Sequence, residues 1–231
     1  MKIKRALLIG NSDGIGLATT KKLLSEGWEV TGVSRSRSDI SSKNYNHIVK
    51  QVQKEGYEEI IAGAILNFTP VDLCIYFAGI SKPVSFDKMI NQVELFNINL
   101  VGMVRTASVV IPHMLENGEG HFIGISSLAD TLLEPDAAGY HASKAGFSTF
   151  LEGLALAIKP KNINVTNVRF GFVDTKLAVR PLKPFMMDVD RAVEHIMKCL
   201  VKKPVIYTAP RLVVPLVKLR YLWLRILMKF S

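Results

Sequence analysis

The sequence predicts a single α/β domain, in which a doubly wound parallel sheet of about seven strands carries helices on both faces. Short apolar runs of strand length recur along the 231 residues and alternate with longer helical patterns. Such alternation is typical of βαβ units, whose parallel sheet is covered on both faces. A glycine-rich turn joins the first apolar run to the first helical pattern. No repeat, low-complexity segment or linker divides the chain, so one folding unit is expected.

The expected elements follow from these runs. Strands are predicted at 6–9, 30–33, 46–52, 72–77, 121–125, 163–168 and 205–207, and helices at 15–26, 57–66, 88–115, 139–158 and 189–200. The polar segment 34–42 is a surface loop after the second strand. The stretch 174–190 has no clear period and contains Pro181, Pro184, Phe185, Met186 and Met187. It fits a lid over a pocket, and it fits a packed connection equally well.

The net charge of +9 is unevenly distributed. Residues 202–231 hold seven Lys and Arg and no Asp or Glu, which leaves 22 basic and 20 acidic side chains to the rest. The body is therefore nearly neutral, and no nucleic-acid-binding motif accompanies the basic end, so nucleic acid is not expected as a partner. Cys74 and Cys199 lie far apart without a CxxC pattern, which indicates reduced, buried thiols in a cytoplasmic protein. The N-terminus reads as a first strand and has no signal-peptide pattern.

Gly10, Gly14 and Gly16 follow the first apolar run and open the first helical pattern, in the spacing GxxxGxG. At such a turn the backbone bends sharply and approaches a pyrophosphate, whose charge faces the amides at the helix N-terminus. The motif therefore predicts a dinucleotide site on a Rossmann-type sheet.

The loop after the second strand is where such a sheet reads the adenosine ribose. Ser34, Arg35 and Arg37 occupy it, and no acid occurs before Asp39. An acidic residue there would bind the 2′-hydroxyl of NAD, whereas a basic one accommodates the extra phosphate of NADP. NADP(H) is therefore favoured over NAD(H). Asp13 slightly weakens this argument, because it adds a negative charge to the glycine turn at 10–16, called the phosphate loop below.

Tyr140 and Lys144 are four residues apart in a helical segment, so their side chains share one helix face. A neighbouring ammonium favours the phenolate, which would bring the tyrosine closer to a useful acid/base range. Ser127 lies at the end of the predicted strand 121–125. There its hydroxyl could hold a substrate oxygen for Tyr140 to protonate.

With these residues in place, the chain resembles the classical branch of the short-chain dehydrogenase/reductase family. The resemblance extends from the first strand to about Tyr207. It rests on GNSDGIG at 10–16, Asn99 in NINLVG, Ser127 thirteen residues before Tyr140, and YHASK at 140–144. A YxxxK alone is common by chance, but these motifs in this order and spacing are specific.

The resemblance implies a role for each motif residue. Tyr140 would be the general acid/base, Ser127 would orient the reacting oxygen, Lys144 would bind the nicotinamide ribose and lower the pKa of Tyr140, and Asn99 would help hold a water in a proton relay. Hydride would pass between the nicotinamide and a carbonyl carbon. The expected cofactor contacts are Gly10, Ser12, Asp13, Gly14, Ile15, Gly16, Ser34, Arg35, Ala78, Gly79, Tyr140, Lys144, Gly171, Val173 and Thr175.

The chain departs from the family pattern at several positions. The family's NNAG is YFAG at 76–79, the proline of its PG motif is Phe170, the threonine before the first loop glycine is Ile9, and Gln51 stands where an Asp near the adenine is frequent. These changes concern cofactor affinity and loop geometry, and they remove no catalytic side chain. His113, His121, His141 and His195 have no spacing that suits a metal, and no metal is expected.

The C-terminal tail, 211–231, predicts an amphipathic basic helix that begins near Pro215. Fifteen residues at ~1.5 Å per residue are too short for the ~30 Å of a bilayer, and cations interrupt the run. An anionic membrane surface is the favoured partner of the tail, and packing in a homo-oligomer or on the protein's own body is the alternative.

Together these observations predict a catalytic domain at 1–210 and a tail at 211–231. The leading hypothesis is an NADP(H)-dependent oxidoreductase that acts on the carbonyl or alcohol of an apolar small molecule. The apolar preference is inferred from Phe172, Phe185, Met186 and Met187. The alternative is a nucleotide-binding sensor or scaffold that keeps the fold with weak turnover. We expect a homo-oligomer in the cytoplasm, peripheral to a membrane if the tail binds lipid.

Overall fold

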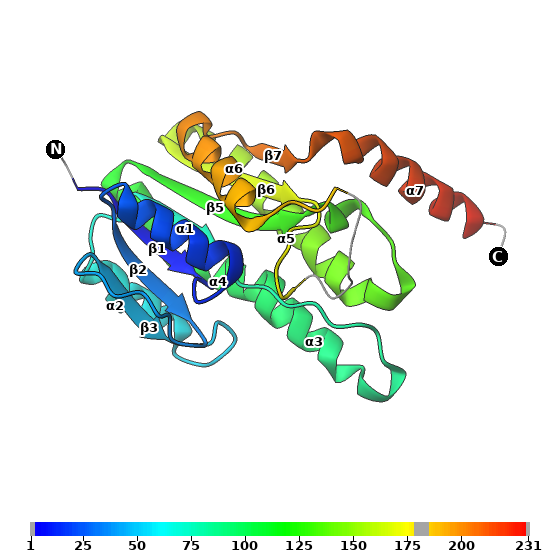
Figure 1. Cartoon of the computed structure of the whole chain (residues 1–231), viewed down its shortest axis with the longest axis horizontal. Coiled ribbons are helices and arrows are strands. Elements are labelled where there is room, and N and C mark those ends of the chain that lie inside the picture. Colours follow the sequence, from blue (N-terminus) through cyan, green and yellow to red (C-terminus); the bar gives the residue numbers. More distant parts are fainter. Residues whose placement is uncertain (1–2, 178–184, 230–231) are drawn as a thin grey trace.

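The computed structural model describes residues 3–177 and 185–229 and confirms the predicted α/β domain. In this part of the chain one sheet has seven parallel strands, in the order β3-β2-β1-β4-β5-β6-β7 (Figure 1). Because the order reverses between β1 and β4, their carboxyl ends form the switch point at which ligands bind in such sheets. The strands are β1 (Arg5–Ile9), β2 (Glu29–Ser34), β3 (Tyr45–Val49), β4 (Leu73–Tyr76), β5 (Gly120–Ser127), β6 (Ile163–Phe170) and β7 (Ile206–Ala209).

Helices cover both faces of the sheet, as expected. Two helices, α1 and α6, pack together on one face, and α2, α4 and α5 lie on the other (Figure 1). The helix bounds are α1 (Gly14–Ser25), α2 (Tyr57–Leu66), α3 (Ile90–Phe96), α4 (Gly102–Asn117), α5 (Ala138–Ile158), α6 (Val189–Lys202) and α7 (Val214–Leu227). The described parts of the strands and helices therefore form three layers.

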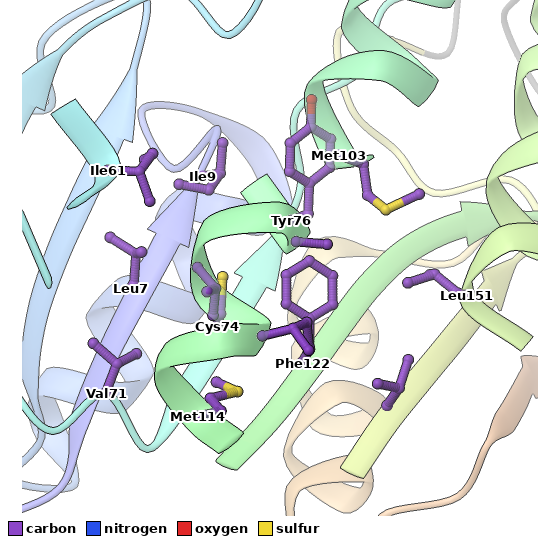
Figure 2. Close-up of a cluster of buried hydrophobic side chains, with 14 of the residues drawn as sticks. Leu7, Ile9, Ile61, Val71, Cys74, Tyr76, Met103, Met114, Phe122 and Leu151 are labelled. Carbon is purple, nitrogen blue, oxygen red and sulfur yellow. The ribbon is translucent and has the colours of Figure 1, made fainter. Parts of the chain in front are cut away.

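Alternation along β1 shows how one strand serves two cores. Leu7 and Ile9 pack with Phe122, Phe147 and the helices α2, α4 and α5, whereas the intervening residues pack toward α1 and α6 (Figure 2). Successive side chains of a strand point to opposite faces, so a strand covered on both sides must be apolar throughout. This double burial is why the strands read as continuous apolar runs in the sequence.

The predicted helix at 88–115 is interrupted. Its first part is α3, which a π-helical turn, η2 (Asn97–Val101), joins to α4. The stretch Ile90–Asn117 is long and apolar enough to cross a membrane by length and composition. Met103, Val110 and Met114 of α4 are nevertheless packed in the core, which accounts for its apolar character.

Other boundaries differ by a few residues. The predicted strand 46–52 ends at Val49, because the chain turns at 50–56 before α2, while Val52 packs in the core. Cys74 and Cys199 are free thiols buried in the two cores, as expected. Of the predicted lid, residues 178–184, including Pro181 and Pro184, lie outside the described residues. The division of the chain at residue 210 stays a prediction.

Replacement of Phe122 tests the larger core. Phe122 is fully buried at the centre of the cluster in Figure 2, so Phe122→Ala leaves a cavity that its neighbours fill only in part. We expect a loss of about 3–5 kcal/mol in the free energy of unfolding, measured by urea denaturation. Leu156→Ala, at a position that is 70% exposed, is the control and should change this energy by less than about 0.5 kcal/mol. Equal losses in the two variants would contradict the described core.

Candidate active site

The carboxyl ends of the parallel strands gather the predicted site residues at one edge of the sheet. Gly10 follows β1, Ala78 and Gly79 follow β4, Ser127 ends β5, and Gly171 follows β6. Five chain segments thus contribute to one region when α5, with Tyr140 and Lys144, is included. The sequence spreads these residues over more than 160 positions, and only the sheet brings them together.

The phosphate loop is shaped by two glycines that no other residue could replace. Gly10 has φ +84°, and a Cβ there would lie 2.6 Å from the backbone nitrogen of Ala78. A Cβ on Gly16 would lie 2.4 Å from the carbonyl oxygen of Gly10. The loop therefore folds tightly against α1 and against the chain after β4, with the N-terminus of α1 toward the loop.

Asp13 caps α1 and pairs with a lysine that the sequence did not identify. Its carboxylate accepts a hydrogen bond from Gly14 N at 2.8 Å and forms an ion pair with Lys176 Nζ at 2.6 Å. These two contacts lower the pKa of Asp13. Thr175 lies over Gly14, with its methyl carbon 3.4 Å from the position of a Cβ there. The segment 175–176 thus covers the phosphate loop, and Lys176 offsets the acidic charge that weakened the NADP argument.

Ser127 and Tyr140 form the centre of the predicted catalytic set. The Ser127 hydroxyl accepts a hydrogen bond from Ala129 N at 3.1 Å. Burial raises the pKa of Tyr140, the neighbouring Ser127 hydroxyl lowers it, and the charge of Asp130 raises it, with a net shift upward. In this geometry Ser127 is therefore the group that favours the phenolate, and the expected effect of Lys144 on this pKa is not among its causes.

Lys144 is buried one helical turn after Tyr140. Its Nζ donates to the carbonyl oxygen of Ile125 at 2.9 Å and lies 4.7 Å from the centre of the Phe147 ring. Burial lowers the pKa of Lys144 to about 8, against an opposing effect of Asp130. A Cβ on Gly79 would lie 3.8 Å from this Nζ, so the ammonium also borders the loop after β4.

Asn99 sits in the π-helical turn η2 and is fully buried. Its side chain accepts from Ile80 N at 2.8 Å and donates to Ile80 O and to Ser143 Oγ, both at 3.0 Å. Asn99 therefore ties the loop after β4 to the helix that carries Tyr140 and Lys144. π-Helical turns are rare in proteins as a whole, but many of those that occur lie at functional sites. The sequence did not predict this one.

The departure YFAG has a structural explanation. Tyr76, at the first position of that motif, donates from its hydroxyl to the carbonyl oxygen of Ile98 at 2.6 Å, next to Asn99. Gly102 leaves the space for this hydroxyl, because a Cβ there would lie 2.4 Å from it. A large aromatic residue thus takes a place in which the family has asparagine, and it supports the turn that holds Asn99.

Asp130 and Arg169 are a buried ion pair beside the site that sequence reasoning missed. Arg169 donates from Nε to Asp130 at 2.6 Å and from its terminal nitrogen at 2.5 Å, and Ser148 donates to the same carboxylate at 2.6 Å. The Asp130 side chain is only 3% exposed. An arginine inside the apolar run of β6 was the one signal in the sequence that an acid had to lie nearby.

The histidines named in the sequence have structural roles. His141 bonds the carbonyl oxygens of Ala129 and Leu132, His121 bonds Thr166, and His195 bonds Tyr207. Within 3–177 and 185–229, no group of three His, Cys, Asp or Glu could hold a metal ion.

The described ends of the predicted lid are packed. Val173 and Met187 form a parallel bridge, and Asp174 N donates to Met187 O at 2.8 Å. Met187 is buried in the core formed with α6, so its side chain is packed there and is not exposed for the substrate contact that the sequence suggested. Phe172 and Phe185 are partly exposed at the carboxyl edge of the sheet. At the adenosine end, Gln51 hydrogen-bonds Gln53 on the surface beyond β3.

Comparisons with known proteins identify the family of this chain. The family model for short chain dehydrogenases matches residues 4–183. The 3-oxoacyl-[acyl-carrier-protein] reductase FabG of Thermotoga maritima is 26% identical over 191 residues, which cover 75% of this chain and 76% of that protein. An uncharacterized oxidoreductase of Staphylococcus aureus strain MRSA252 is 28% identical over 184 residues, or 75% and 80% of the two chains. The fold and site define an oxidoreductase, and the chain belongs to the short-chain dehydrogenase family.

Solved structures show the same fold. A short-chain dehydrogenase from Burkholderia cenocepacia J2315, in complex with NADP, superposes with a TM-score of 0.84 at 20% identity, over 94% of this chain and 92% of that one. One from Sphingobium yanoikuyae, in complex with NADPH, gives 0.81 at 19% identity, over 98% and 96%. A third, from Streptomyces avermitilis, gives 0.84 at 22% identity, over 99% and 96%.

Removing the charge of Asp130 tests its influence on the site. Asp130 raises the pKa of both Tyr140 and Lys144, so Asp130→Asn should lower both values. If Tyr140 must be protonated during reduction, the alkaline limb of the pH–rate profile should move to lower pH by roughly one unit. Ser148→Ala, which removes a hydrogen bond and keeps the charge, is the control. A profile of Asp130→Asn that matches the wild type would show that the ion pair only supports the fold.

Proposed function

We propose that the protein is an NADP(H)-dependent oxidoreductase that transfers hydride between the nicotinamide and the carbonyl or alcohol of a small, apolar molecule. One observation carries the proposal. Ser127, Tyr140, Lys144 and Asn99 lie at the same sheet edge as the glycine loop. Asn99 bonds Ser143, whose hydroxyl donates to the backbone carbonyl oxygen of Tyr140. Lys144 bonds Ile125 of β5, and Ser127 lies close enough to Tyr140 to lower its pKa. The intact set is the reason to favour an enzyme over a nucleotide-binding sensor or scaffold with the same fold.

The residues present fit a dinucleotide. The loop from Gly10 to Gly16 leaves no room for side chains against α1 and β4, and helix N-termini favour a pyrophosphate. We assign Ser12, Gly14 and Ile15 to the pyrophosphate, Ala78 and Gly79 to the adenosine side, and Gly171, Val173 and Thr175 to the nicotinamide side. When bound, the nicotinamide would supply the hydride, and the protein supplies position and proton transfer.

Two hydroxyls of the chain would handle the substrate oxygen during reduction. Ser127 holds this oxygen by a hydrogen bond and Tyr140 donates a proton to it, so the carbonyl group becomes the hydroxyl group of an alcohol. A tyrosine with a raised pKa is fully protonated at neutral pH and is ready to act as the acid. Lys144 would orient the ribose hydroxyls, and its pKa of about 8 lets it exchange a proton near neutral pH.

The preference for NADP(H) rests on charge. Arg35 and Arg37 are exposed on the loop after β2, where the adenosine ribose would lie, and Lys176 pairs with the one acid of the phosphate loop. The solved relatives from Burkholderia and Sphingobium carry NADP and NADPH, respectively. An apolar substrate is supported by the exposed rings of Phe172 and Phe185 at the carboxyl edge.

Replacement of the proton donor tests the reaction. Tyr140→Phe should lower kcat for NADPH-dependent reduction by at least roughly 100-fold, because general acid catalysis commonly contributes that much. NADPH oxidation over a panel of aldehydes, ketones and 3-oxoacyl thioesters is the measurement. Tyr207→Phe, which removes a phenol hydroxyl bonded to His195 away from the site, is the control. Undiminished turnover in Tyr140→Phe would remove the mechanism, and tight NADPH binding by the wild type without turnover would favour the sensor.

We also propose that α7 binds an anionic membrane surface, at the cytoplasmic side. The helix extends from the body in Figure 1 and contacts it mainly near η3 (Leu128–Thr131), with an ion pair between Arg220 and Glu134. Val217 and Leu224 are half-buried on this side. At about 100° per residue, Leu219, Trp223 and Ile226 fall on the opposite side of the helix, and they are 65%, 58% and 47% exposed.

The free face of α7 is therefore apolar where a helix at a soluble surface would be polar. Lys218 and Arg225 lie along one flank of this face, and Lys229 continues the same row. The whole tail has no acid. Two tails packed together would bring these cations into mutual repulsion, whereas anionic lipid headgroups neutralise them. Charge thus favours a lipid surface over the homo-oligomer contact that remains the alternative.

Vesicle sedimentation tests this surface. The wild type should pellet with phosphatidylglycerol vesicles and much less with phosphatidylcholine vesicles, and Trp223→Glu or truncation after Pro210 should abolish pelleting. Val201→Glu, at an 84% exposed apolar position on α6, is the control and should pellet like the wild type. If all forms stay in the supernatant and Trp223→Glu instead dissociates a dimer in gel filtration, the tail is an oligomer contact.

A further inference from the structure

A chain of polar side chains lies beneath the loop that would hold the adenosine ribose. Asn11 Nδ2 donates to the Tyr45 hydroxyl at 2.8 Å, and this hydroxyl lies 2.5 Å from His47 Nδ1. The other ring nitrogen, Nε2, lies 3.1 Å from both Ser34 Oγ and Ser36 O. His47 thus connects the phosphate loop, through Tyr45 and Asn11, with the loop after β2.

The sheet makes room for this chain at one glycine. Gly32 of β2 pairs in register with His47 of β3. A Cβ on Gly32 would lie 2.2 Å from Asn11 Nδ2, so any side chain there would displace Asn11. Thr20 of α1 accepts a further hydrogen bond from Asn11 at 3.2 Å. The polar chain therefore occupies a place between β2, β3 and α1 that apolar side chains fill elsewhere in the sheet.

The directions of the hydrogen bonds in this row of polar side chains are those expected of a neutral His47. The Tyr45 hydroxyl donates to Nδ1 once it accepts from Asn11, so Nε2 carries the ring proton and donates to Ser36 O. Burial is the largest cause that lowers the pKa of His47, and the charge of Arg37 lowers it further. Burial likewise raises the pKa of Tyr45, which stays a neutral donor.

The neighbouring hydrogen bonds can rearrange when His47 takes up a second proton and becomes an imidazolium. Protonated Nδ1 must donate, so the Tyr45 hydroxyl must accept there and turn its own proton elsewhere. Asn11 Oδ1 is fully buried and has no hydrogen-bond partner, and it lies in the side chain that Tyr45 already contacts. After a rotation of the amide, that oxygen would accept the redirected hydrogen bond of the Tyr45 hydroxyl.

From this geometry we infer that His47 takes part in binding a phosphate monoester on the 2′-oxygen of the adenosine ribose. The inference rests on the proposed function and adds a residue from β3 to the basic loop. Arg35 and Arg37 supply two fixed charges from that loop, and His47 supplies a third that forms when the phosphate dianion approaches. His47 acts through Ser34 and Ser36, whose positions it holds, and is in this sense a positioning residue.

The charges around His47 are few. From the loop after β2 Arg37 acts on it, from its own strand Tyr45 is the titratable neighbour, and the contacts from the phosphate loop and α1 come from the uncharged Asn11 and Thr20. Among the described residues that contact His47, none therefore brings a negative charge. A bound phosphate would supply that charge.

Binding of two small nucleotides tests the inference. The probes are 2′-AMP and 5′-AMP, measured by calorimetry at pH 6 and pH 8. Both carry a phosphate monoester with a similar second ionisation, so the ratio of their affinities cancels the titration of the phosphate itself. In the wild type the preference for 2′-AMP should rise at pH 6, by roughly tenfold if a charge-assisted contact forms.

His47→Gln keeps a donor near Nε2 and cannot take up a proton. This variant should retain a preference that no longer rises at pH 6, and His47→Lys should show a raised preference at both pH values. Asn46→Ala, a neighbour on β3 whose side chain points to the opposite face, is the control and should follow the wild type. Circular dichroism checks that each variant folds.

The outcomes separate this inference from the proposed function. If His47→Gln and the wild type show the same preference at both pH values, His47 takes no part in phosphate binding, while the retained preference for 2′-AMP still supports NADP(H). If the wild type itself binds 5′-AMP as tightly as 2′-AMP, the NADP(H) preference fails, and this inference fails with it.

Discussion

The carbonyl oxygen of Ile9 accepts hydrogen bonds from Phe77 N at 2.8 Å and Ala78 N at 3.1 Å, and much of the candidate active site depends on this junction. It clamps the end of β1 to the chain after β4, and Gly10 makes the approach sterically allowed. Two residues further on, Ile80 exchanges two hydrogen bonds with Asn99. Asn99 then reaches Ser143, beside Lys144 on α5. The glycine loop and α5 are thus parts of one continuous set of backbone and side-chain contacts.

Buried charge sets the chemistry at the end of this path. Lys144 is buried among apolar groups and bonded to a carbonyl oxygen, and burial lowers its pKa to about 8. Asp130 and Arg169 bring two further charges close to Tyr140; because they are paired, their attraction offsets part of the cost of burying them, and their fields partly cancel. One helix thereby carries a neutral phenol and, one turn later, an ammonium whose pKa lies near neutrality, as the proposed proton transfer requires.

The same reasoning explains why the departures from the family pattern are tolerated. Tyr76 replaces a polar residue in YFAG, and its hydroxyl still reaches the backbone next to Asn99 because Gly102 leaves space. Phe170, in place of the proline of the PG motif, is buried in the core that faces α1 and α6, where its ring lies 6.4 Å from that of His195. Both residues therefore find their partners in the folded chain. A further arginine, Arg220, ties α7 to the body, so that the apolar face of the helix points away from it.

The sequence by itself determined the features that depend on short spacings. The strand and helix periods, the glycine loop, Tyr140 and Lys144 on one helix face, and the basic tail all follow from residues within about a turn or a strand of each other. Strand order, register and the approach of distant segments decided the rest. Asp13 meets Lys176 across 163 positions, and His47 joins Ser34 to Asn11 only because β3 pairs with β2 over a glycine. The hydrophobic periodicity of a segment predicts that it is a strand but does not predict which strands will be its neighbours. The partners of these polar side chains are therefore seen only in the folded chain.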